Sequence, residues 1–506
     1  MNPNSTTGPV AAWPAARALL AANDFAGALS AYTALVRAFP LVAGVWFDYG
    51  AAAAGLRRWD LADSAWNRTR ELAPRDAELI AMIGHRYQGA RRPERARECF
   101  AQAAAADPRA INPRISLAVL LERGHDLAAA REAVAESLAI DPRDEQARYL
   151  QAVLDRRAGD SAGAERGLRD LLTPEPAHPF VRYAARYELA QLLDRSGRVD
   201  EAMTELATAK ELVRQITDVA PLLRAYDHGA ASARQFTRSL PRDILQTWAG
   251  YFPPRKREAI PPLVFLGGHP RSGTTLLESV LDAHSEIAAL DEPTAFLDLL
   301  QPAFYQAADR LSSHRVNQLR ALYVAALLDE TGPAARGKTL VDKNPSPTAR
   351  LPVWLRLFPE LRVLIALRDP RDVVLSCYFQ NLPLNTDNVN FLSLERVAKH
   401  YADLMDIWLI VREWPGFQWR ETRYEDLVAD LPGEGRKVTE FLGLPWQPAQ
   451  EQFHQRLGTS ANHSPTYQDV TRPVYTRSVA RWRAYEKHLA PVLPALEPYC
   501  RALGYA

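Results

Sequence analysis

A glycine-rich turn that carries one cation and three hydroxyls is the stretch of this 506-residue chain that most clearly indicates chemistry. Residues 264–276 read Val-Phe-Leu-Gly-Gly-His-Pro-Arg-Ser-Gly-Thr-Thr-Leu, an apolar strand that runs into the turn and then into an apolar helix. Such a turn directs backbone N–H groups at an anion, and the helix dipole adds about half a positive charge. Arg271 adds a full charge, and Ser272, Thr274 and Thr275 add hydroxyl donors. The turn therefore predicts a site for a phosphate-like group.

This turn differs from the nucleotide-binding P-loop, G-x-x-x-x-G-K-[ST], at one decisive position. Gly268 and Gly273 have the P-loop spacing, but Thr274 stands where the P-loop has Lys. That Lys reaches the terminal phosphates of ATP, so its absence argues against an ATPase or kinase. With Pro and Arg inside the turn, the stretch instead resembles the 5′-phosphosulfate loop of sulfotransferases, which use 3′-phosphoadenosine 5′-phosphosulfate (PAPS). An ordinary strand-to-helix turn is the alternative.

A second motif follows a near-continuous apolar run at residues 361–367, which predicts a buried parallel strand. Arg368 follows that strand, Pro370 suits the first turn of a helix, and Ser376 lies eight residues after Arg368. This order resembles the sulfotransferase 3′-phosphate site, where a guanidinium grips the phosphate in a fork and a hydroxyl completes its shell. The alternative is a surface turn of ion pairs.

The carboxylate pair Asp291 and Glu292 narrows the resemblance to protein-tyrosine sulfotransferases and their bacterial relatives. In that family the general base is a Glu that follows the loop Arg at a fixed spacing, and the same spacing separates Arg271 from Glu292. A carboxylate can take a hydroxyl proton when it lies within hydrogen-bond reach. Asp291 is the rival base, and the alternative for Glu292 is a helix-capping or solvated loop acid.

Lys343 matches the active-site Lys of the same family, which is expected to neutralise charge on the bridging oxygen as sulfate leaves. It follows an apolar Leu-Val pair, which favours a strand end, and strand ends are where ligands bind in such sheets. Positioning and charge stabilisation are enough for sulfuryl transfer, so no covalent bond to the protein is expected. The resemblance implies no metal.

Two weaker matches and one departure lie nearer the C-terminus. Residues 423–427 resemble a family segment whose Tyr, here Tyr424, lies near the cofactor. Residues 474–482 resemble the segment that closes over the nucleotide, in which Ser478 would touch it. The family usually has a second Arg four residues past the phosphate-site Ser, whereas this chain has Gln380. That departure bears on how tightly the 3′-phosphate is held.

The resemblance covers about residues 261–490 and implies two sets of site residues. The catalytic set is Glu292, Lys343 and Arg271. The cofactor-binding set is Arg271, Ser272, Gly273, Thr274, Thr275, Arg368, Ser376, Tyr424 and Ser478.

Five prolines that recur at a constant interval mark a repeat in the first part of the chain. They are Pro40, Pro74, Pro108, Pro142 and Pro176. Their interval of about 34 residues is the tetratricopeptide (TPR) signature of paired antiparallel helices. Because such arrays form a concave surface that holds peptides or partner proteins, a protein partner in the TPR groove is expected. The surface could recruit an acceptor protein, position the catalytic domain or form a homodimer.

Composition excludes several classes of partner. The chain has 61 basic and 60 acidic residues, so it generates no strong field for nucleic acid or a membrane surface. It has no run of about 18 apolar residues, so no membrane span is expected. Its three cysteines are few and scattered, which fits a reducing cytoplasm. No His or Cys cluster has metal-ligand spacing.

We therefore expect an α + α/β two-domain chain. An N-terminal TPR α-solenoid would occupy residues 10–215, and a helical linker residues 216–260. A P-loop-like α/β sulfotransferase domain with a mostly parallel sheet would follow at residues 261–506. The linker is placed where residues 235–239 and the prolines at 253–254 interrupt the helical pattern.

The expected reaction moves a sulfuryl group from PAPS to an acceptor hydroxyl on a protein or small molecule, with protein tyrosine among the acceptors. Glu292 would act as general base, and 3′,5′-bisphosphoadenosine (PAP) would remain. Two alternatives stay open. One is a TPR scaffold that binds PAP without catalysis, and the other is a P-loop kinase that uses ATP.

Overall fold

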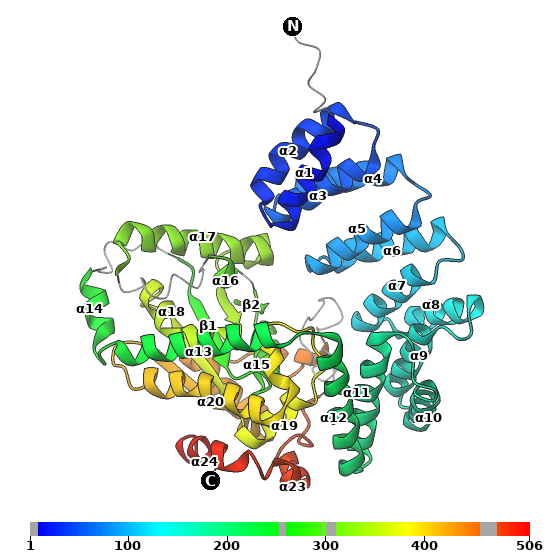
Figure 1. Cartoon of the computed structure of the whole chain (residues 1–506). Helices are drawn as coiled ribbons and strands as arrows, with labels where there is room; N and C mark the ends of the chain where they lie inside the picture. Colours follow the sequence, from blue (N-terminus) through cyan, green and yellow to red (C-terminus); the bar gives the residue numbers. More distant parts are fainter. Residues whose placement is uncertain (1–8, 252–259, 294, 300–309, 456–472, 506) are drawn as a thin grey trace. The chain divides into compact units, whose positions relative to one another are not determined.

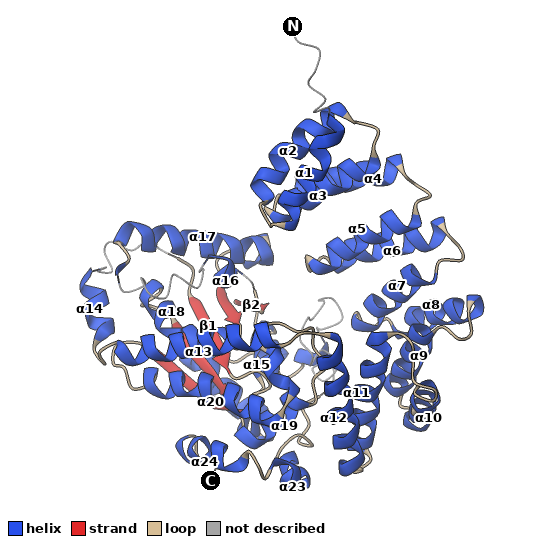
Figure 2. Cartoon of the chain, viewed as in Figure 1, coloured by secondary structure: helices blue, strands red, loops and turns tan. Residues whose placement is uncertain are grey.

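The computed structural model describes five stretches of the chain, which Figure 1 colours by position: residues 9–251, 260–293, 295–299, 310–455 and 473–505. The chain divides into two units, residues 1–181 (unit 1) and residues 182–506 (unit 2). The described residues of unit 1 form helices only, whereas unit 2 also contains a sheet (Figure 2). The expected combination of helical repeats and an α/β domain with a parallel sheet is confirmed.

Unit 1 consists of helix pairs whose bounds recur at the interval of the repeated prolines. The second helix of each of the first four pairs ends two residues before one of these prolines, where an X-Pro step disfavours helical backbone. The helices are α1 (Pro9–Ala21), α2 (Phe25–Ala38), α3 (Ala43–Gly55), α4 (Trp59–Leu72), α5 (Ala77–Gly89), α6 (Pro93–Ala106), α7 (Ile111–Arg123), α8 (Leu127–Ile140), α9 (Glu145–Ala158) and α10 (Ser161–Leu171).

The turn inside each pair repeats at the same period and in the same backbone conformation. One residue of each turn has a positive φ, between 57° and 92°. A backbone N–H near it donates to a carbonyl oxygen at the end of the first helix of the pair. In the second pair, for example, the N–H of Arg58 bonds to the oxygen of Ala53 at 2.9 Å. The positive-φ residues are Asn23, Arg57, Arg91, His125 and Gly159.

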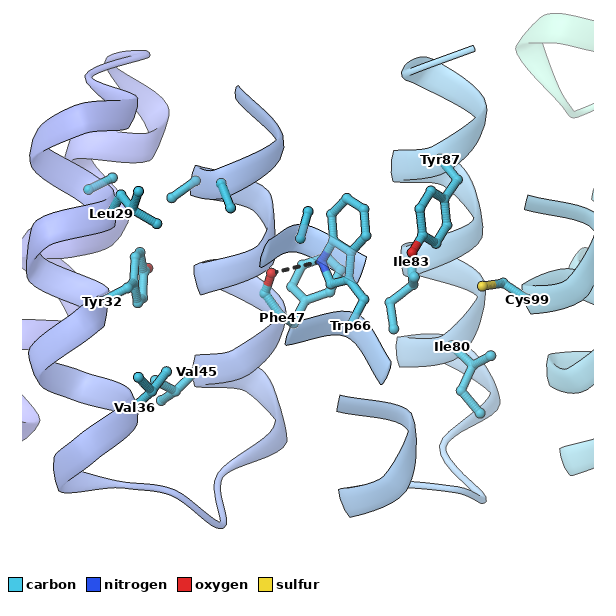
Figure 3. Close-up of a cluster of buried hydrophobic side chains, with 14 of the residues drawn as sticks. Leu29, Tyr32, Val36, Val45, Phe47, Trp66, Ile80, Ile83, Tyr87 and Cys99 are labelled. Carbon is cyan, nitrogen blue, oxygen red and sulfur yellow. Dashed lines mark hydrogen bonds between the residues drawn. The ribbon is translucent and has the colours of Figure 1, made fainter. Parts of the chain in front are cut away.

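Alanines, aliphatic residues and aromatic residues together form the core of the first repeats of unit 1, part of which Figure 3 shows. The indole N–H of Trp66 donates to the oxygen of Phe47 at 3.1 Å, and its ring meets that of Tyr87 edge-on at 4.7 Å. A Cβ added at Gly84 would lie 2.7 Å from Phe100. Because glycine leaves room for the ring, neighbouring helices approach closely enough to bury it.

Unit 2 begins with helices rather than with the sheet. They are α11 (Pro179–Arg195), which crosses the division between the units, α12 (Val199–Ile216), α13 (Ala220–Ser239) and α14 (Ile244–Tyr251). The expected interruption at residues 235–239 is wrong, because α13 runs through them. Its Thr237 hydroxyl bonds back to the oxygen of Ala233 at 2.9 Å, so this polar stretch remains compatible with helix. The prolines at 253–254 lie outside the described residues.

The sheet of unit 2 has five strands, all parallel, in the order β2-β3-β1-β4-β5. The central strand is buried at all six positions, as its continuous apolar run predicts. The strands are β1 (Leu263–Gly268), β2 (Ile287–Asp291), β3 (Thr339–Lys343), β4 (Arg362–Leu367) and β5 (Gln418–Arg423).

Helices cover both faces of this sheet. On one face Val264 and Leu266 of the central strand pack with α15, α21 and α22, and on the other the Phe265 ring lies 5.1 Å from that of Trp354 in α18. The helices of this region are α15 (Thr274–Asp282), α16 (Ala295–Leu299), α17 (Ser313–Thr331), α18 (Leu351–Leu357), α19 (Pro370–Tyr378), α20 (Leu394–Val411), α21 (Tyr424–Ala429), α22 (Leu431–Phe441), α23 (Glu486–Leu489) and α24 (Leu493–Ala502).

Candidate active site

Every strand of the sheet leads, at its carboxyl end, to a residue that the sequence singles out. Because all five strands are parallel, their carboxyl ends share one edge of the sheet, which is where ligands bind in folds of this class. The sheet thus gathers residues that lie far apart in the sequence. They are Arg271 after β1, Glu292 after β2, Lys343 at the end of β3, Arg368 after β4 and Tyr424 after β5.

The turn after β1 is shaped by two glycines with positive φ. Gly268 has a φ of 126° and Gly273 one of 93°, and a Cβ at Gly273 would lie 2.7 Å from the Tyr424 ring. The N–H of Ser272 bonds to the oxygen of His269 at 3.1 Å, which closes the turn. Thr274 then begins α15, and an α-helix leaves its first N–H groups without partners inside the helix. The turn and the start of α15 therefore have the backbone geometry that the predicted anion site requires.

Arg271 connects the turn to the predicted 3′-phosphate site. Its Nε donates to the Ser376 hydroxyl at 3.1 Å, and its carbonyl oxygen accepts from Arg368 at 3.3 Å. The other terminal nitrogen of Arg368 donates to the oxygen of Ser478 at 2.6 Å. The structure thus brings Arg271, Arg368, Ser376 and Ser478 together, as the resemblance implies.

The surroundings of Arg368 are enclosed and polar. Its side chain is 7% exposed, lies over the Tyr424 ring at 4.9 Å, and keeps a buried Nε that has no hydrogen-bond partner. The Asp372 carboxylate lies 3.9 Å away. Burial raises the pKa of Asp372 to about 6, although Arg368 and the Trp482 N–H oppose the shift. A buried guanidinium with an unpaired nitrogen suits an anionic ligand.

Gln380, which stands where the resemblance predicts an Arg, bonds to the helix that carries Ser376. Its amide donates to the oxygen of Ser376 at 2.8 Å, which keeps the side chain bonded to its own helix end. The Ser376 hydroxyl accepts from the Arg271 guanidinium at 3.1 Å.

Lys343 lies among three carboxylates. Its ammonium is fully buried and donates to Asp291 and, at 3.3 Å, to Glu292, while the Glu278 carboxylate lies 3.8 Å away. Burial lowers the pKa of Lys343, but the three carboxylates more than offset it, so the pKa is raised and the charge is retained.

Glu278 is a residue of this cluster that the sequence analysis missed. It lies on α15 and is 8% exposed, and one of its carboxylate oxygens has no hydrogen-bond partner. Burial raises its pKa to about 8; Lys343 lowers it, while Asp291, Asp282 and Glu292 raise it. The signal was present, because an acid that follows two leucines in a short helix packed on a sheet must find a cation or take up a proton.

Glu292 and Asp291 differ in exposure and in backbone conformation. The Glu292 side chain is 42% exposed and that of Asp291 15%. Glu292 has a φ of 53°, and its N–H bonds to the oxygen of Lys343 at 2.8 Å. The two carboxylates therefore point from one strand end to the same ammonium, and Glu292 is the more accessible to a second substrate.

Backbone strain gathers at this site. Among the described residues of unit 2, the non-glycine residues with positive φ are Arg271, Glu292 and Ala480, at 72°, 53° and 54°. Such conformations cost free energy and persist where the surroundings impose them, often at functional sites. All three lie within or beside the candidate site.

A buried pair of histidines connects the glycine-rich turn to α20. His269 Nδ1 lies 2.8 Å from the Pro270 oxygen, which can only accept, so Nδ1 carries the proton. His269 Nε2 then accepts from Nδ1 of His400 at 2.8 Å. Burial lowers the pKa of both rings, that of His400 to about 3, so both remain neutral. Sequence reasoning could not pair residues 131 positions apart.

Unit 1 contains a cavity of its own, of about 890 Å³. Most of its lining residues are polar, and they come from α5, α7, α9, the turn before α9 and the turn before α11. The lining residues are His85, Gln88, Asn112, Ile115, Ser116, Val119, Asp141, Arg143, Asp144, Glu145, Gln146, Ala177 and His178.

The described part of the chain offers neither a cluster of metal ligands nor a membrane-spanning helix. Those residues contain no group of three or more His, Cys, Asp or Glu that could hold a metal ion. No helix among them has the length and apolar character needed to cross a membrane.

Comparison with known proteins agrees with the geometry. Residues 262–448 match the sulfotransferase family, and residues 14–77 and 81–145 match the tetratricopeptide repeat family. An uncharacterized protein of Aquifex aeolicus (strain VF5) is 27% identical over 62% of this chain and 41% of its own length. Protein-tyrosine sulfotransferase A of Caenorhabditis elegans is 24% identical over 48% of this chain and 67% of its own length. Protein-tyrosine sulfotransferase 2 of Gallus gallus is 25% identical over 48% and 72%.

The chain thus spans less than half the length of the Aquifex protein and about two thirds of the nematode enzyme. The matched region contains β1 to β5 and the strand ends that carry the candidate site. The comparisons and the fold thus show tetratricopeptide repeats followed by a sulfotransferase domain with a parallel sheet.

Proposed function

We propose that this chain transfers a sulfuryl group from PAPS to an acceptor hydroxyl, with Glu292 as general base. The observation that carries the proposal is the link between the two predicted anion sites. Arg271 of the glycine-rich turn bonds to Ser376, and its carbonyl accepts from Arg368, so one ligand with two anionic ends could reach both.

The residues present suit such a donor. Two guanidinium groups, a serine hydroxyl and the start of α15 supply donors for anionic oxygens. The buried Nε of Arg368 lacks a partner, and Gly273 leaves space beside Tyr424 that a Cβ would fill. When bound, PAPS supplies the sulfuryl group, and its transfer leaves PAP.

Each residue of the catalytic set would have a distinct task. Glu292 would take the proton of the acceptor hydroxyl, since its carboxylate is the more exposed of the adjacent pair. Lys343 would hold positive charge at the end of β3, where three carboxylates keep it protonated. Arg271 and the N–H groups of the turn would stabilise negative charge on the transferred group.

Protein tyrosine is the acceptor that we propose first. Support comes from two of the similar proteins, which are protein-tyrosine sulfotransferases, and from the spacing of Arg271 and Glu292. The repeats of unit 1 would then hold a protein partner, with the polar cavity at α5, α7 and α9 as a candidate groove. A cytoplasmic location remains a prediction from the cysteine content.

The donor is tested by thermal unfolding of the full chain with PAP, with ATP and with AMP, repeated on Arg368→Ala. A ligand at a hundredfold excess over its Kd adds about 2.7 kcal/mol, which is readily seen. We expect a shift with PAP, smaller or absent with ATP and AMP, and lost in the variant. A larger shift with ATP would favour the kinase alternative, because Thr274 would then not exclude ATP.

Catalysis is tested separately from binding. Transfer of labelled sulfate from PAPS to a tyrosine peptide, a sugar and a phenol distinguishes the acceptor classes. PAP binding without transfer to any acceptor would favour the scaffold alternative.

A further inference from the structure

The helix pair α11–α12 packs against the part of unit 2 that carries the phosphate site. Lys210 of α12 is fully buried, and its ammonium donates to the oxygen of Phe391 at 2.7 Å and to the Tyr187 hydroxyl at 3.1 Å. It also lies 4.4 Å from the centre of the Tyr378 ring. Tyr378 is on α19, two residues after Ser376. The sequence places this pair at the end of the repeat array, yet it contacts the catalytic fold directly.

The same pair contacts a second part of the site through one carboxylate. Asp194, near the end of α11, accepts from the guanidinium of Arg481 at 3.0 Å and from the Tyr485 hydroxyl at 2.6 Å. Arg481 also lies over the Phe379 ring at 4.3 Å, and the Tyr485 ring meets that ring edge-on at 5.7 Å. Asp194 is therefore fixed against the end of α19 by two side chains 287 and 291 positions away.

Residues 473–485, here called the C-terminal segment, contact the donor site on their other side. The Ser478 oxygen accepts from Arg368, and the Trp482 N–H donates to Asp372 at 2.7 Å. The Arg371 guanidinium lies 3.9 Å from the centre of the Trp482 ring. Ala480, between these contacts, has a φ of 54°. A strained backbone conformation persists only where the surrounding contacts impose it.

We propose that Asp194 is a positioning residue for the donor site, because it holds Arg481 and so places the Ser478 carbonyl against Arg368. The inference rests on the proposed function, since it assigns to the same site a residue outside the family match. It gives α11–α12 a task in donor binding that a peptide-binding repeat would not have.

Because the ion pair between Asp194 and Arg481 is partly buried, its loss should have a measurable effect on donor binding. The side chains of Asp194 and Arg481 are each 22% exposed, so solvent screens them less than it screens a surface pair. The chain also offers a matched control on the same two helices. Arg186 and Glu205 are 2.8 Å apart with exposures of 20% and 19%, and among the described residues their hydrogen bond and ion pair join only each other.

The test is calorimetric titration of PAP into the full chain and its Asp194→Ala and Glu205→Ala variants. We expect about tenfold weaker binding in Asp194→Ala, about 1.4 kcal/mol, and a change below about twofold in Glu205→Ala. Comparable melting temperatures of the two variants would show that the loss is not general destabilisation. Equal PAP affinity in the wild-type chain and in Asp194→Ala would overturn the proposal.

A double-mutant cycle shows whether Asp194 acts through Arg481. The losses of PAP affinity caused by Asp194→Ala and Arg481→Ala should not add in the double variant, because each single variant already removes the same Asp194–Arg481 contact. Additive losses would overturn the proposed route. Hydrolysis of PAPS without acceptor should also rise in Asp194→Ala, an effect that lost stability alone would not produce.

The contact made by Asp194 can be tested even if the proposed function is wrong. If the wild-type chain bound no PAP, amide hydrogen exchange would still test the contact itself. Exchange across residues 478–485 should then be faster in Asp194→Ala than in Glu205→Ala, and equal rates would overturn the inference.

Discussion

Glu292 and Asp291 are adjacent acids at one strand end, and their surroundings give them different tasks. Asp291 is the more buried and forms the closest contact with Lys343, whereas Glu292 has nearly half of its side chain exposed. A base must reach its proton directly, so accessibility favours Glu292. Asp291 would instead hold the lysine in place.

Replacing each acid in turn tests this division. We expect Glu292→Gln to lower kcat by about 10²–10⁴-fold with little change in the Kd for PAP, because general-base catalysis contributes about that factor. Asp291→Asn should lower the melting temperature more than Glu292→Gln, since it removes the closer and more buried of the two negative charges beside the buried ammonium. Turnover and unfolding measurements on both variants distinguish the roles. Full activity in Glu292→Gln would exclude it as the base.

Glu278 makes stability depend on pH. Its pKa is about 8 in the folded chain against 4.5 ordinarily, so the folded state binds more protons between those values. Its contribution to stability is fully present below about pH 4.5 and is lost as the pH rises through about 8. The melting temperature of the wild-type chain should therefore fall relative to that of Glu278→Gln between pH 5 and pH 8. A constant difference would contradict the buried, proton-binding state.

At the scale of elements, the turns of unit 1 repeat a strained conformation in different residues. Arg91 has a φ of 57° between α5 and α6, where a side chain is disfavoured, while the equivalent turn between α9 and α10 has a glycine, Gly159. The fold thus requires the left-handed backbone at each turn, and packing of the helices imposes it where the residue does not prefer it.

Arg91→Gly should therefore stabilise unit 1. We expect a gain of about 0.5–1 kcal/mol, since the cost of a left-handed Arg, roughly 1–2 kcal/mol, exceeds the added freedom of glycine in the unfolded chain. Urea unfolding followed by circular dichroism measures it. Arg86→Gly, inside α5, is the control and should destabilise by about 1 kcal/mol. A loss of stability in Arg91→Gly would mean that the Arg side chain contributes more than the strain costs.

Local sequence predicted the elements and their order well. Apolar runs with turn residues behind them marked the ends of β1 and β4, and Pro370 does begin α19, with Asp369 as its cap. The pattern failed at residues 235–239, where polar residues suggest a break although they lie on a helix that tolerates them. Polarity alone does not end a helix, and α13 ends only at Ser239.

Contacts between distant elements could not be predicted. Glu278 became a site residue because α15 packs on the sheet beside β3, and the His269–His400 pair exists because α20 lies behind the turn. Neither position has a sequence partner at a fixed spacing. The roles proposed for the motif residues, Arg271 and Lys343 among them, remain predictions until variants are measured.

At the scale of the whole molecule, the two units should respond differently to ligand. PAP would bind in unit 2, and a ligand stabilises the unit that holds it by mass action. Differential scanning calorimetry of the full chain should therefore show PAP raising one transition, while Arg91→Gly raises the other. The Arg368→Ala variant should abolish the first effect and spare the second. A single transition that both changes raise equally would show that the units unfold together.

The recurrence of helix bounds at a constant interval has a consequence for how the chain could change in length. Because the first four pairs begin and end at equivalent points, gaining or losing one whole period of sequence there would join a helix end to the same kind of turn that it had before. The array could thus grow or shrink in complete steps without breaking a helix. A step of any other size would put an apolar helix face toward water. The pair α11–α12 would be exempt from such steps, because its Asp194 and Lys210 are tied to residues of the catalytic fold.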